Sequence, residues 1–292
     1  MVLDAATAAA LLPKRNPDGH KGTFGTVVCV CGSLDYAGAA LLAGTAAARA
    51  GAGLVVLAVP ASLQALFAGR VPELVTLGLP EQANGADIDA MESGHALKAK
   101  QADALVVGCG LRESDGYGEL VSGLMAREGS PMVVDSGALN MLAGSGEWWS
   151  GARRECVLTP HAGEFERLTG APAGQTDAER AASAVAAAHR FGQIVVLKGA
   201  RTVIADAAGT TAVSPFANPA LATAGSGDVL AGTIGALIAQ GARPFHAACL
   251  GVYLHGRAGE RLSDQYGDAG VLASELPRFI AFARHELGAQ NP

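Results

Sequence analysis

The feature that most constrains the fold is a repeated pattern, in which a short apolar run is followed by a glycine-containing turn and then by an alanine-rich stretch. The apolar runs are continuous rather than alternating, as in Leu54-Val55-Val56-Leu57, which is typical of strands covered on both faces. Strands are expected at Thr26 to Cys31, Leu54 to Val59, Leu74 to Leu79, Ala104 to Val107, Met132 to Asp135, Val157 to Thr159 and Ile194 to Lys198. With helical stretches between most of them, the pattern predicts an α/β fold with a mostly parallel central sheet and helices on both faces.

The segments after the seventh strand predict a different local structure. Thr202 to Ala205 and Thr210 to Val213, separated by a turn ending in Gly209, predict a β-hairpin toward one end of the sheet. Three helices are expected after the hairpin, around 228 to 240, 244 to 262 and 270 to 286.

The more polar segment from Pro80 to Lys100 is expected to form a turn and a surface helix rather than a domain boundary. The chain of 292 residues is 50% hydrophobic, so it can bury a sizeable core. Residues 1–292 are therefore predicted to form a single domain.

Charge and hydropathy exclude several classes of partner. The 27 acidic and 21 basic residues give a net charge of −6, which favours neither nucleic acid nor an anionic membrane. No apolar run is long enough to span a bilayer, and Asp4 interrupts any secretory-signal pattern. Five scattered cysteines in mostly apolar surroundings are interpreted as buried structural thiols, which fits a reducing cytoplasm.

The most informative motif is Gly225-Ser226-Gly227-Asp228, which runs into an apolar stretch from Val229 to Ile238. The two glycines let the backbone turn tightly, and the first amides of the following helix have no intrahelical partners, so the motif can bind phosphate. Asp228 would repel that phosphate unless it had another task, such as taking a proton from a hydroxyl that accepts a phosphoryl group. The alternative is an ordinary capped helix with an acidic first turn.

Other polar residues follow the predicted strands, where open parallel sheets bind ligands. Asp135, with Asn140 nearby, either holds a metal-bound water or phosphate-bound magnesium, or caps a helix. After the next strand, Glu164 is a candidate for orienting a hydrated magnesium ion, and His161 for donating a hydrogen bond to a polar substrate.

Lys198 and Arg201 lie close together in a chain with few charges. They suit a nucleotide diphosphate, or else they are two solvated residues at the entrance of the hairpin. No Walker loop or three-glycine dinucleotide loop occurs in the chain. His255 has no recognisable partner and is interpreted as structural.

Seven motifs occur in a distinctive order: His20 to Gly25, Gly32-Ser33 with Tyr36 to Ala39, Arg49 to Val55, Asp135 with Ala138-Leu139-Asn140, Leu158 to Glu164, Val196 to Gly199, and Asn218 to Asp228. Taken jointly, they make the chain resemble the ribokinase-like superfamily and, within it, the ADP- or ATP-dependent NAD(P)H-hydrate dehydratases. The resemblance covers nearly the whole chain.

Members of this family repair hydrated NADH or NADPH. The resemblance implies a nucleotide-dependent dehydration of the S-form of NADHX or NADPHX, the two hydrates, with AMP and phosphate as the other products when ADP is the donor. It implies that Asp228 activates the hydroxyl of the hydrate and that the amides of Gly225, Ser226 and Gly227 hold the transferred phosphoryl group. The resulting phosphate ester then eliminates phosphate.

The resemblance also implies binding residues and partners. It places the hydrated cofactor near Ala39, Gly110, His161 and Asp228. It places the nucleotide near Lys198, Gly199, Ala200, Arg201, Thr202 and Gly227, with Mg²⁺ accompanying the phosphates. Bacterial relatives generally use ADP and are often tetramers, so an ADP-dependent homo-oligomer is expected, without the epimerase domain of two-domain relatives.

Two segments depart from the family pattern. Cys109 and Arg112 replace Pro and Gly in the loop that usually reads Gly-Pro-Gly-Leu-Gly, and Gly137 replaces the second acid of Asp-Ala-Asp, which weakens a metal site at Asp135. Two other functions stay open: a ribokinase-like kinase of a vitamin precursor or sugar, which would stop at the phosphate ester, and a non-catalytic module that binds adenine nucleotides.

Overall fold

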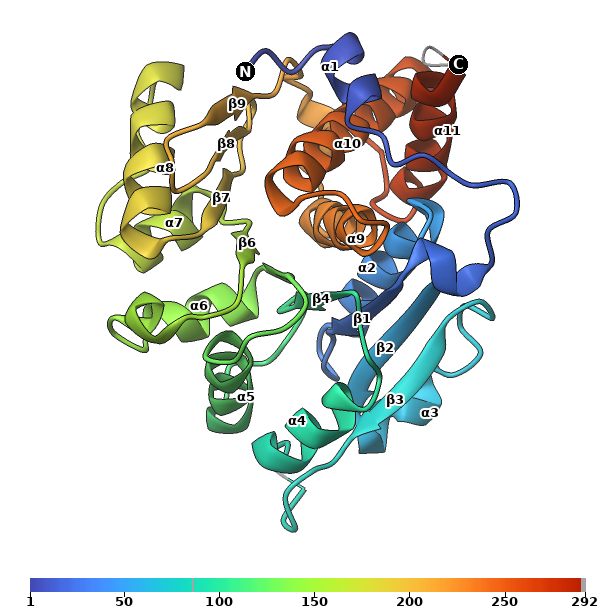
Figure 1. The fold of residues 1–292 in the computed structure, drawn as a ribbon, viewed down its shortest axis with the longest axis vertical. Helices are drawn as coiled ribbons and strands as arrows, with labels where there is room; N and C mark the ends of the chain where they lie inside the picture. Colours follow the sequence, from blue (N-terminus) through green and yellow to red (C-terminus); the bar gives the residue numbers. More distant parts are fainter. Residues whose placement is uncertain (86, 290–292) are drawn as a thin grey trace.

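The computed structural model describes residues 1–85 and 87–289, and its strands form one nine-stranded sheet with the order β3-β2-β1-β4-β5-β6-β7-β8-β9 (Figure 1). The parallel strands are β1 (Thr26–Val30), β2 (Leu54–Pro60), β3 (Val75–Leu79), β4 (Ala104–Val107), β5 (Met132–Val134), β6 (Cys156–Leu158) and β7 (Ile194–Leu197). The antiparallel hairpin of β8 (Val203–Ala205) and β9 (Thr211–Val213) completes one edge. The predicted α/β class, with its terminal hairpin, is confirmed.

Helices cover both faces of the sheet (Figure 1). One face packs against α1 (Ala5–Ala10), α2 (Ala37–Arg49), α9 (Ser226–Ala239), α10 (Pro244–Tyr266) and α11 (Leu276–Ala289). The other packs against α4 (Ala90–Lys98), α5 (Asp115–Met125), α6 (Gly137–Ala143), α7 (Ala162–Thr169) and α8 (Asp177–Phe191), and the short α3 (Gln64–Phe67) follows β2. In β1, Val27 contributes to the first core and Val28 to the second, so the strand is buried on both faces and reads as a continuous apolar run.

The C-terminal region differs from the sequence-based expectation at two helix boundaries. The helix expected from residue 270 begins only at Leu276, because Gly270 adopts φ +91° and the residues after it form turns. The helix expected to end at 262 continues to Tyr266 and stops at Gly267, where φ is +80°. The surface helix predicted between Pro80 and Lys100 is α4.

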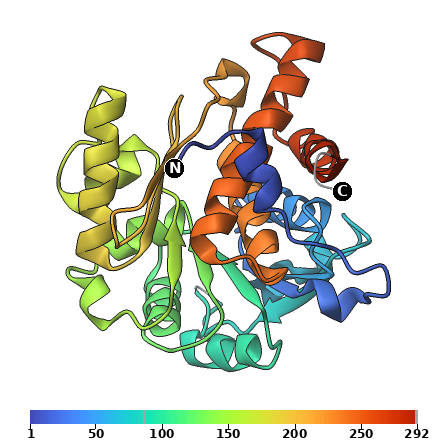
Figure 2. The same cartoon turned by 45° about the horizontal axis from the view of Figure 1, so that its top comes forward.

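The N-terminus reinforces the hairpin edge of the sheet. The ammonium group of Met1 donates a hydrogen bond to the carbonyl of Thr211 at 2.6 Å, and Val2 forms a parallel bridge with Val213. Figure 2 shows this segment running past the hairpin to α1, which lies in front of α10. Within residues 1–85 and 87–289, no helix is both long and apolar enough to cross a bilayer.

Helix α9 lies at the centre of its layer and fixes the position of the site. All its residues from Val229 to Ala239 are buried, because the helix packs between the sheet, α2 and α10. Gly232 allows the closest approach, since a Cβ there would lie 2.0 Å from the backbone oxygen of Ala43 in α2. The packing aims the first turn of α9 at the carboxyl ends of the central strands.

Candidate functional site

The site lies where the direction of strand order reverses. The chain builds β1, β2 and β3 toward one edge and then returns to place β4 on the other side of β1. Ligands bind at such switch points, outside the carboxyl ends of the strands. Four residues with polar or thiol side chains follow the carboxyl ends of neighbouring strands: Cys109 after β4, Asp135 after β5, Thr159 after β6 and Lys198 after β7.

Asp135 and Lys198 form the centre of this cluster. Lys198 Nζ lies 2.7 Å from Asp135 Oδ1 and 3.7 Å from Glu164 Oε2, and the hydroxyl of Thr159 donates to Asp135 Oδ1 at 2.7 Å. Burial by itself would lower the pKa of Lys198, but the charges of Asp135 and Glu164 outweigh it and raise that pKa. Lys198 is therefore a permanent cation, and Asp135 forms an ion pair rather than capping α6.

The first turn of α9 faces this ion pair. Gly225 precedes the helix with φ +90°, a conformation that glycine adopts without strain. Among the residues that the structure describes, the amides of Gly227 and Asp228 have no hydrogen-bond partner. A Cβ at Gly227 would lie 3.2 Å from Lys198 Nζ, so the two free amides and the lysine converge on one point. The arrangement suits a phosphoryl group.

Asp228 stands in the same turn as these amides and is half-buried. Burial and the negative charge of Asp135 raise the pKa of Asp228 to about 7, although the nearby Cys109 thiol and the charge of Lys198 act in the opposite direction. A carboxyl group with a pKa near neutrality can both accept and release a proton under ordinary conditions, as a general base requires.

His161 and Glu164 cap the start of α7. The His161 ring nitrogen Nδ1 accepts from the amides of Gly163 and Glu164 at 3.1 Å and 3.3 Å, while Glu164 Oε2 accepts from the His161 amide at 2.8 Å. The carboxylate of Glu164 is 6% exposed and already contacts the His161 amide, Lys198 and, at 3.4 Å, His161 Nε2, so any role toward magnesium would act through water. The His161 side chain as a whole is 54% exposed.

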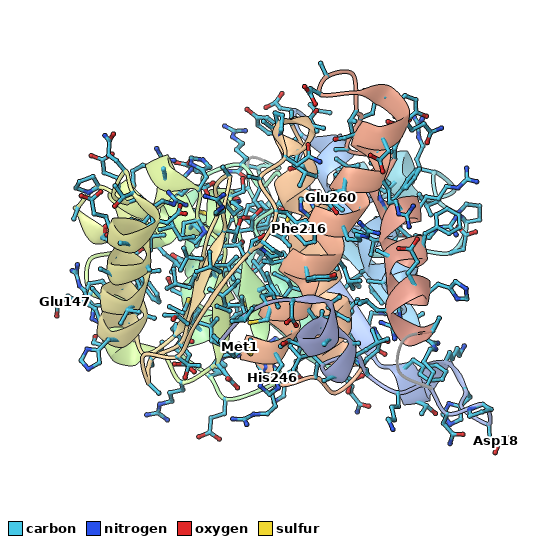
Figure 3. All side chains as sticks on the ribbon, turned by 90° about the horizontal axis from the view of Figure 1, so that it is seen from above. Met1, Asp18, Glu147, Phe216, His246 and Glu260 are labelled. Carbon is cyan, nitrogen blue, oxygen red and sulfur yellow. The ribbon has the colours of Figure 1, made fainter. Side chains whose placement is uncertain are left out.

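A cavity of about 700 Å³ extends from the first turn of α9 toward α10. At one end it is lined by Lys198, Ser226 and Gly227. At the other end it is lined by apolar side chains, and Phe216 there turns toward α10, where its ring centroid lies 5.1 Å from that of Tyr253 (Figure 3). The cationic end of the cavity suits the phosphates of a nucleotide, and the apolar end suits its base.

The other residues predicted to bind nucleotide divide into two groups. Gly199, Ala200 and Thr202 line the cavity together with Lys198. Arg201 points elsewhere, because its guanidinium pairs with the exposed carboxylate of Asp177 at 3.1 Å. The two cations are close in sequence, but only Lys198 faces the anion site.

Ala39 and Gly110, predicted to contact the hydrated cofactor, are neighbours across the switch point. A Cβ at Gly110 would lie 2.6 Å from the Cβ of Ala39, in the first turn of α2. The Asp228 carboxylate also lies near α2. Gly225 is next to both, because a Cβ placed on Gly225 would lie 2.5 Å from Leu42 of α2 and 3.7 Å from Asp228 Oδ2. Asp228 thus stands between the cavity and the surface formed by Ala39 and Gly110.

His255, interpreted as structural, has a partner that was not recognisable in the sequence. The ring nitrogen Nε2 lies 3.0 Å from the backbone oxygen of Ser226, and burial lowers the pKa of His255 to about 4. The neutral ring therefore donates from Nε2 and holds the first turn of α9 in place. Sequence gave no signal for this contact, because 29 residues separate the two partners. Thr159 and Cys109 were missed as partners of Asp135 for the same reason.

Known proteins similar to this chain were identified by sequence and by structure. The sequence profile described as NAD(P)H-hydrate dehydratase matches residues 27–281. The chain is 42% identical over 287 residues to the bifunctional NAD(P)H-hydrate repair enzyme Nnr of Moorella thermoacetica, a match covering 98% of this chain and 54% of that protein. It is 38% identical to the ADP-dependent (S)-NAD(P)H-hydrate dehydratase of Neisseria meningitidis, covering 94% of this chain and 89% of that protein.

A solved structure gives a similar result. The fold superposes on the ADP/ATP-dependent NAD(P)H-hydrate dehydratase of Bacillus subtilis, co-crystallised with ATP/Mg²⁺, with a TM-score of 0.81, 30% identity and coverage of 98% of both chains. The chain spans about half the length of several of the curated relatives that it matches.

Proposed function

This chain belongs to the NAD(P)H-hydrate dehydratase family, and from that premise we propose that it uses a nucleotide to dehydrate hydrated NADH or NADPH. The observation that carries the proposal is the position of Asp228, a carboxyl group with its pKa raised to about 7 beside two unpartnered helix amides and the Lys198 cation. A base adjacent to an anion site is what transfer of a phosphoryl group to a hydroxyl requires.

In the first step Asp228 accepts the proton of the substrate hydroxyl, whose oxygen forms a bond to the terminal phosphorus of the nucleotide. The bond from that phosphorus to the bridging oxygen breaks, and AMP leaves when ADP is the donor. The amides of Gly227 and Asp228 and the Lys198 ammonium stabilise the charge on the transferred group. Their contribution grows as the phosphoryl group becomes detached.

In the second step the carbon–oxygen bond of the phosphate ester breaks. Hydroxide is a poor leaving group, whereas phosphate leaves readily when the lone pair of the ring nitrogen displaces it. Loss of a proton from the neighbouring ring carbon then restores the dihydropyridine. Ala39 and Gly110 lack bulky side chains, so the ring of the hydrate can approach Asp228 from their side.

The charge balance of the site favours a divalent cation with the nucleotide. Three carboxylates, those of Asp135, Glu164 and Asp228, lie around Lys198, so a nucleotide diphosphate would otherwise meet excess negative charge there. A magnesium ion would be held by the phosphate oxygens and by water, with Glu164 in its outer shell, and would neutralise the phosphates. The proposal includes ADP as donor and a homo-oligomeric, cytoplasmic protein.

A direct assay tests this function. The protein is mixed with the hydrate, Mg²⁺ and either ADP or ATP, and the return of NADH or NADPH absorbance is followed. We expect recovery with at least one nucleotide and a faster rate with ADP. Consumption of nucleotide without recovery would indicate a kinase that stops at the ester, and absence of both would leave only a nucleotide-binding module.

Replacing Gly227 by Ala should weaken nucleotide binding by about tenfold or more. A methyl group at this position would lie 3.2 Å from Lys198 Nζ, within the space assigned to the phosphoryl group. The measurement is nucleotide affinity by calorimetry. The matched control is Gly118→Ala, at a helical position with nothing within 4 Å of the new methyl, which should leave affinity unchanged.

The pH profile should show a single ionisation near neutrality. Asp228 must be deprotonated to act as a base, and its pKa in the free protein is about 7. The value of kcat/KM should therefore be constant above pH 8 and fall about tenfold for each unit below pH 6. A profile that stays flat between pH 5 and pH 8 would contradict the assignment of Asp228 as the base.

A further inference from the structure

A buried thiol lies close to both Asp135 and Asp228. Cys109 is fully buried after β4, and its Sγ lies 3.8 Å from Asp135 Oδ2. A carboxylate oxygen of Asp228 lies within 4.8 Å of the same sulfur. The proposed phosphorylation does not use this sulfur.

The geometry leaves one carboxylate oxygen poorly paired. Thr159 and Lys198 both bind Oδ1 of Asp135, so among residues 1–85 and 87–289 the only donor to Oδ2 is the Cys109 thiol. A thiol is a weak donor, and Asp135 is 1% exposed, so water compensates little. A buried carboxylate oxygen without a strong partner is costly, and it points toward Cys109 and Gly227.

We propose that Cys109 Sγ, Asp135 Oδ2 and a carboxylate oxygen of Asp228 form a binding site for a soft divalent cation of the zinc class. Ligand atoms of these three residues all lie within 4.8 Å of one another. In a tetrahedral zinc site, bonds of about 2.3 Å to sulfur and about 2.1 Å to oxygen place those two ligands about 3.6 Å apart. The separation of 3.8 Å between Cys109 and Asp135 is already close to that value.

The ligand set selects the metal. One sulfur and two carboxylate oxygens favour Zn²⁺ or Cd²⁺ over Mg²⁺, which prefers oxygen ligands alone. Binding releases the thiol proton to solvent, because the cation coordinates the thiolate. Lys198 can stay on Oδ1 while the cation takes Oδ2, and the fourth position is left for water.

The consequence for activity rests on the proposed function. A cation bound to Asp228 occupies the oxygen lone pair that would accept the substrate proton, so metal binding at this site should inhibit turnover. Zinc-class ions would then act as inhibitors at the base itself, whereas Mg²⁺ supports the reaction at the phosphates.

Cadmium provides a readout that does not depend on activity, since a cadmium–thiolate bond has its own ultraviolet charge-transfer band. The full chain is titrated with Cd²⁺ in excess Mg²⁺, and bound Zn²⁺ is counted by equilibrium dialysis. We expect one saturable ion per chain and a thiolate band. Cys109→Ser should lose the band, and Asp228→Asn should keep it with at least about tenfold weaker affinity.

The control is Cys249→Ser, which removes a buried thiol from α10 and should leave the band and the stoichiometry unchanged. Circular dichroism checks that each variant is folded. An equal band in Cys109→Ser and the unchanged protein would overturn the proposal, as would the lack of saturation at one ion per chain. Stoichiometric binding without inhibition would overturn the inhibitory role alone, and a failure of NADH recovery would leave the binding result intact.

Discussion

Replacing Asp228 by Asn should reduce turnover by about 10³-fold while nucleotide affinity changes by only a few-fold. An amide is close in size to the carboxylate but cannot take the proton of the substrate hydroxyl, and a positioned general base contributes about 10²–10⁴-fold. In the proposed arrangement the nucleotide contacts the other side of the first turn of α9, where Lys198 and Gly227 line the cavity. Turnover is measured by NADH recovery and affinity by calorimetry.

The same variant should be more stable than the unchanged protein at alkaline pH. The pKa of Asp228 is raised from 3.8 to about 7, so the folded state disfavours the charged form. The penalty is at most about 4 kcal/mol above pH 7 and shrinks as pH falls toward 4, because the folded protein then carries the proton. Urea unfolding at pH 8 and pH 5 tests this. An inactive variant that is also less stable at pH 8 would indicate a structural role for Asp228 instead.

Replacing Lys198 by Met should lower the free energy of unfolding by about 3–5 kcal/mol at pH 7 and also weaken nucleotide binding. The substitution leaves the carboxylates of Asp135 and Glu164, whose side chains are 2% and 6% exposed, without their shared cation. The loss should diminish in acid, since protonation removes the unpaired charge. Urea denaturation over a range of pH gives the free energy of unfolding.

Two further variants separate this effect from a general loss of charge. Arg201→Met removes a cation only three residues away, but its pair with Asp177 is exposed, so the free energy of unfolding should change by less than about 1 kcal/mol. Adding Asp135→Asn to Lys198→Met should recover part of the lost stability, because one unpaired charge is removed. Equal losses in Lys198→Met and Arg201→Met would contradict the central position assigned to the Lys198 ion pair.

The sheet was predictable because the parallel strands other than the edge strand β3 are almost entirely buried on both faces and read as apolar runs. Leu54-Val55-Val56-Leu57 lies within β2, and the hairpin turn ends at Gly209, where φ is +86°. The start of the last helix was not predictable from composition, because residues 271–275 form irregular and turn structure before Leu276. Helix and loop residues have similar polarity in that segment.

Most of the candidate site was predicted from motifs at strand ends, because the carboxyl ends of parallel strands lie at the same edge of the sheet whatever the sequence of the loops. Lys198, Asp135 and Asp228 were each recognisable as unusual in sequence. Their partners were not, because the contact of His255 with Ser226 depends on how α10 packs on α9. Lys198 and Arg201 face different partners for the same reason, since the partner of Arg201 is Asp177 at the start of α8.

The central claim is that the substrate hydroxyl attacks phosphorus before it leaves. A hydrate prepared with heavy oxygen in that hydroxyl distinguishes this path from direct loss of water. The proposed chemistry predicts that the label appears in the inorganic phosphate, in a one-to-one ratio with the NADH or NADPH that is formed. Label released as water, with unlabelled phosphate, would contradict it.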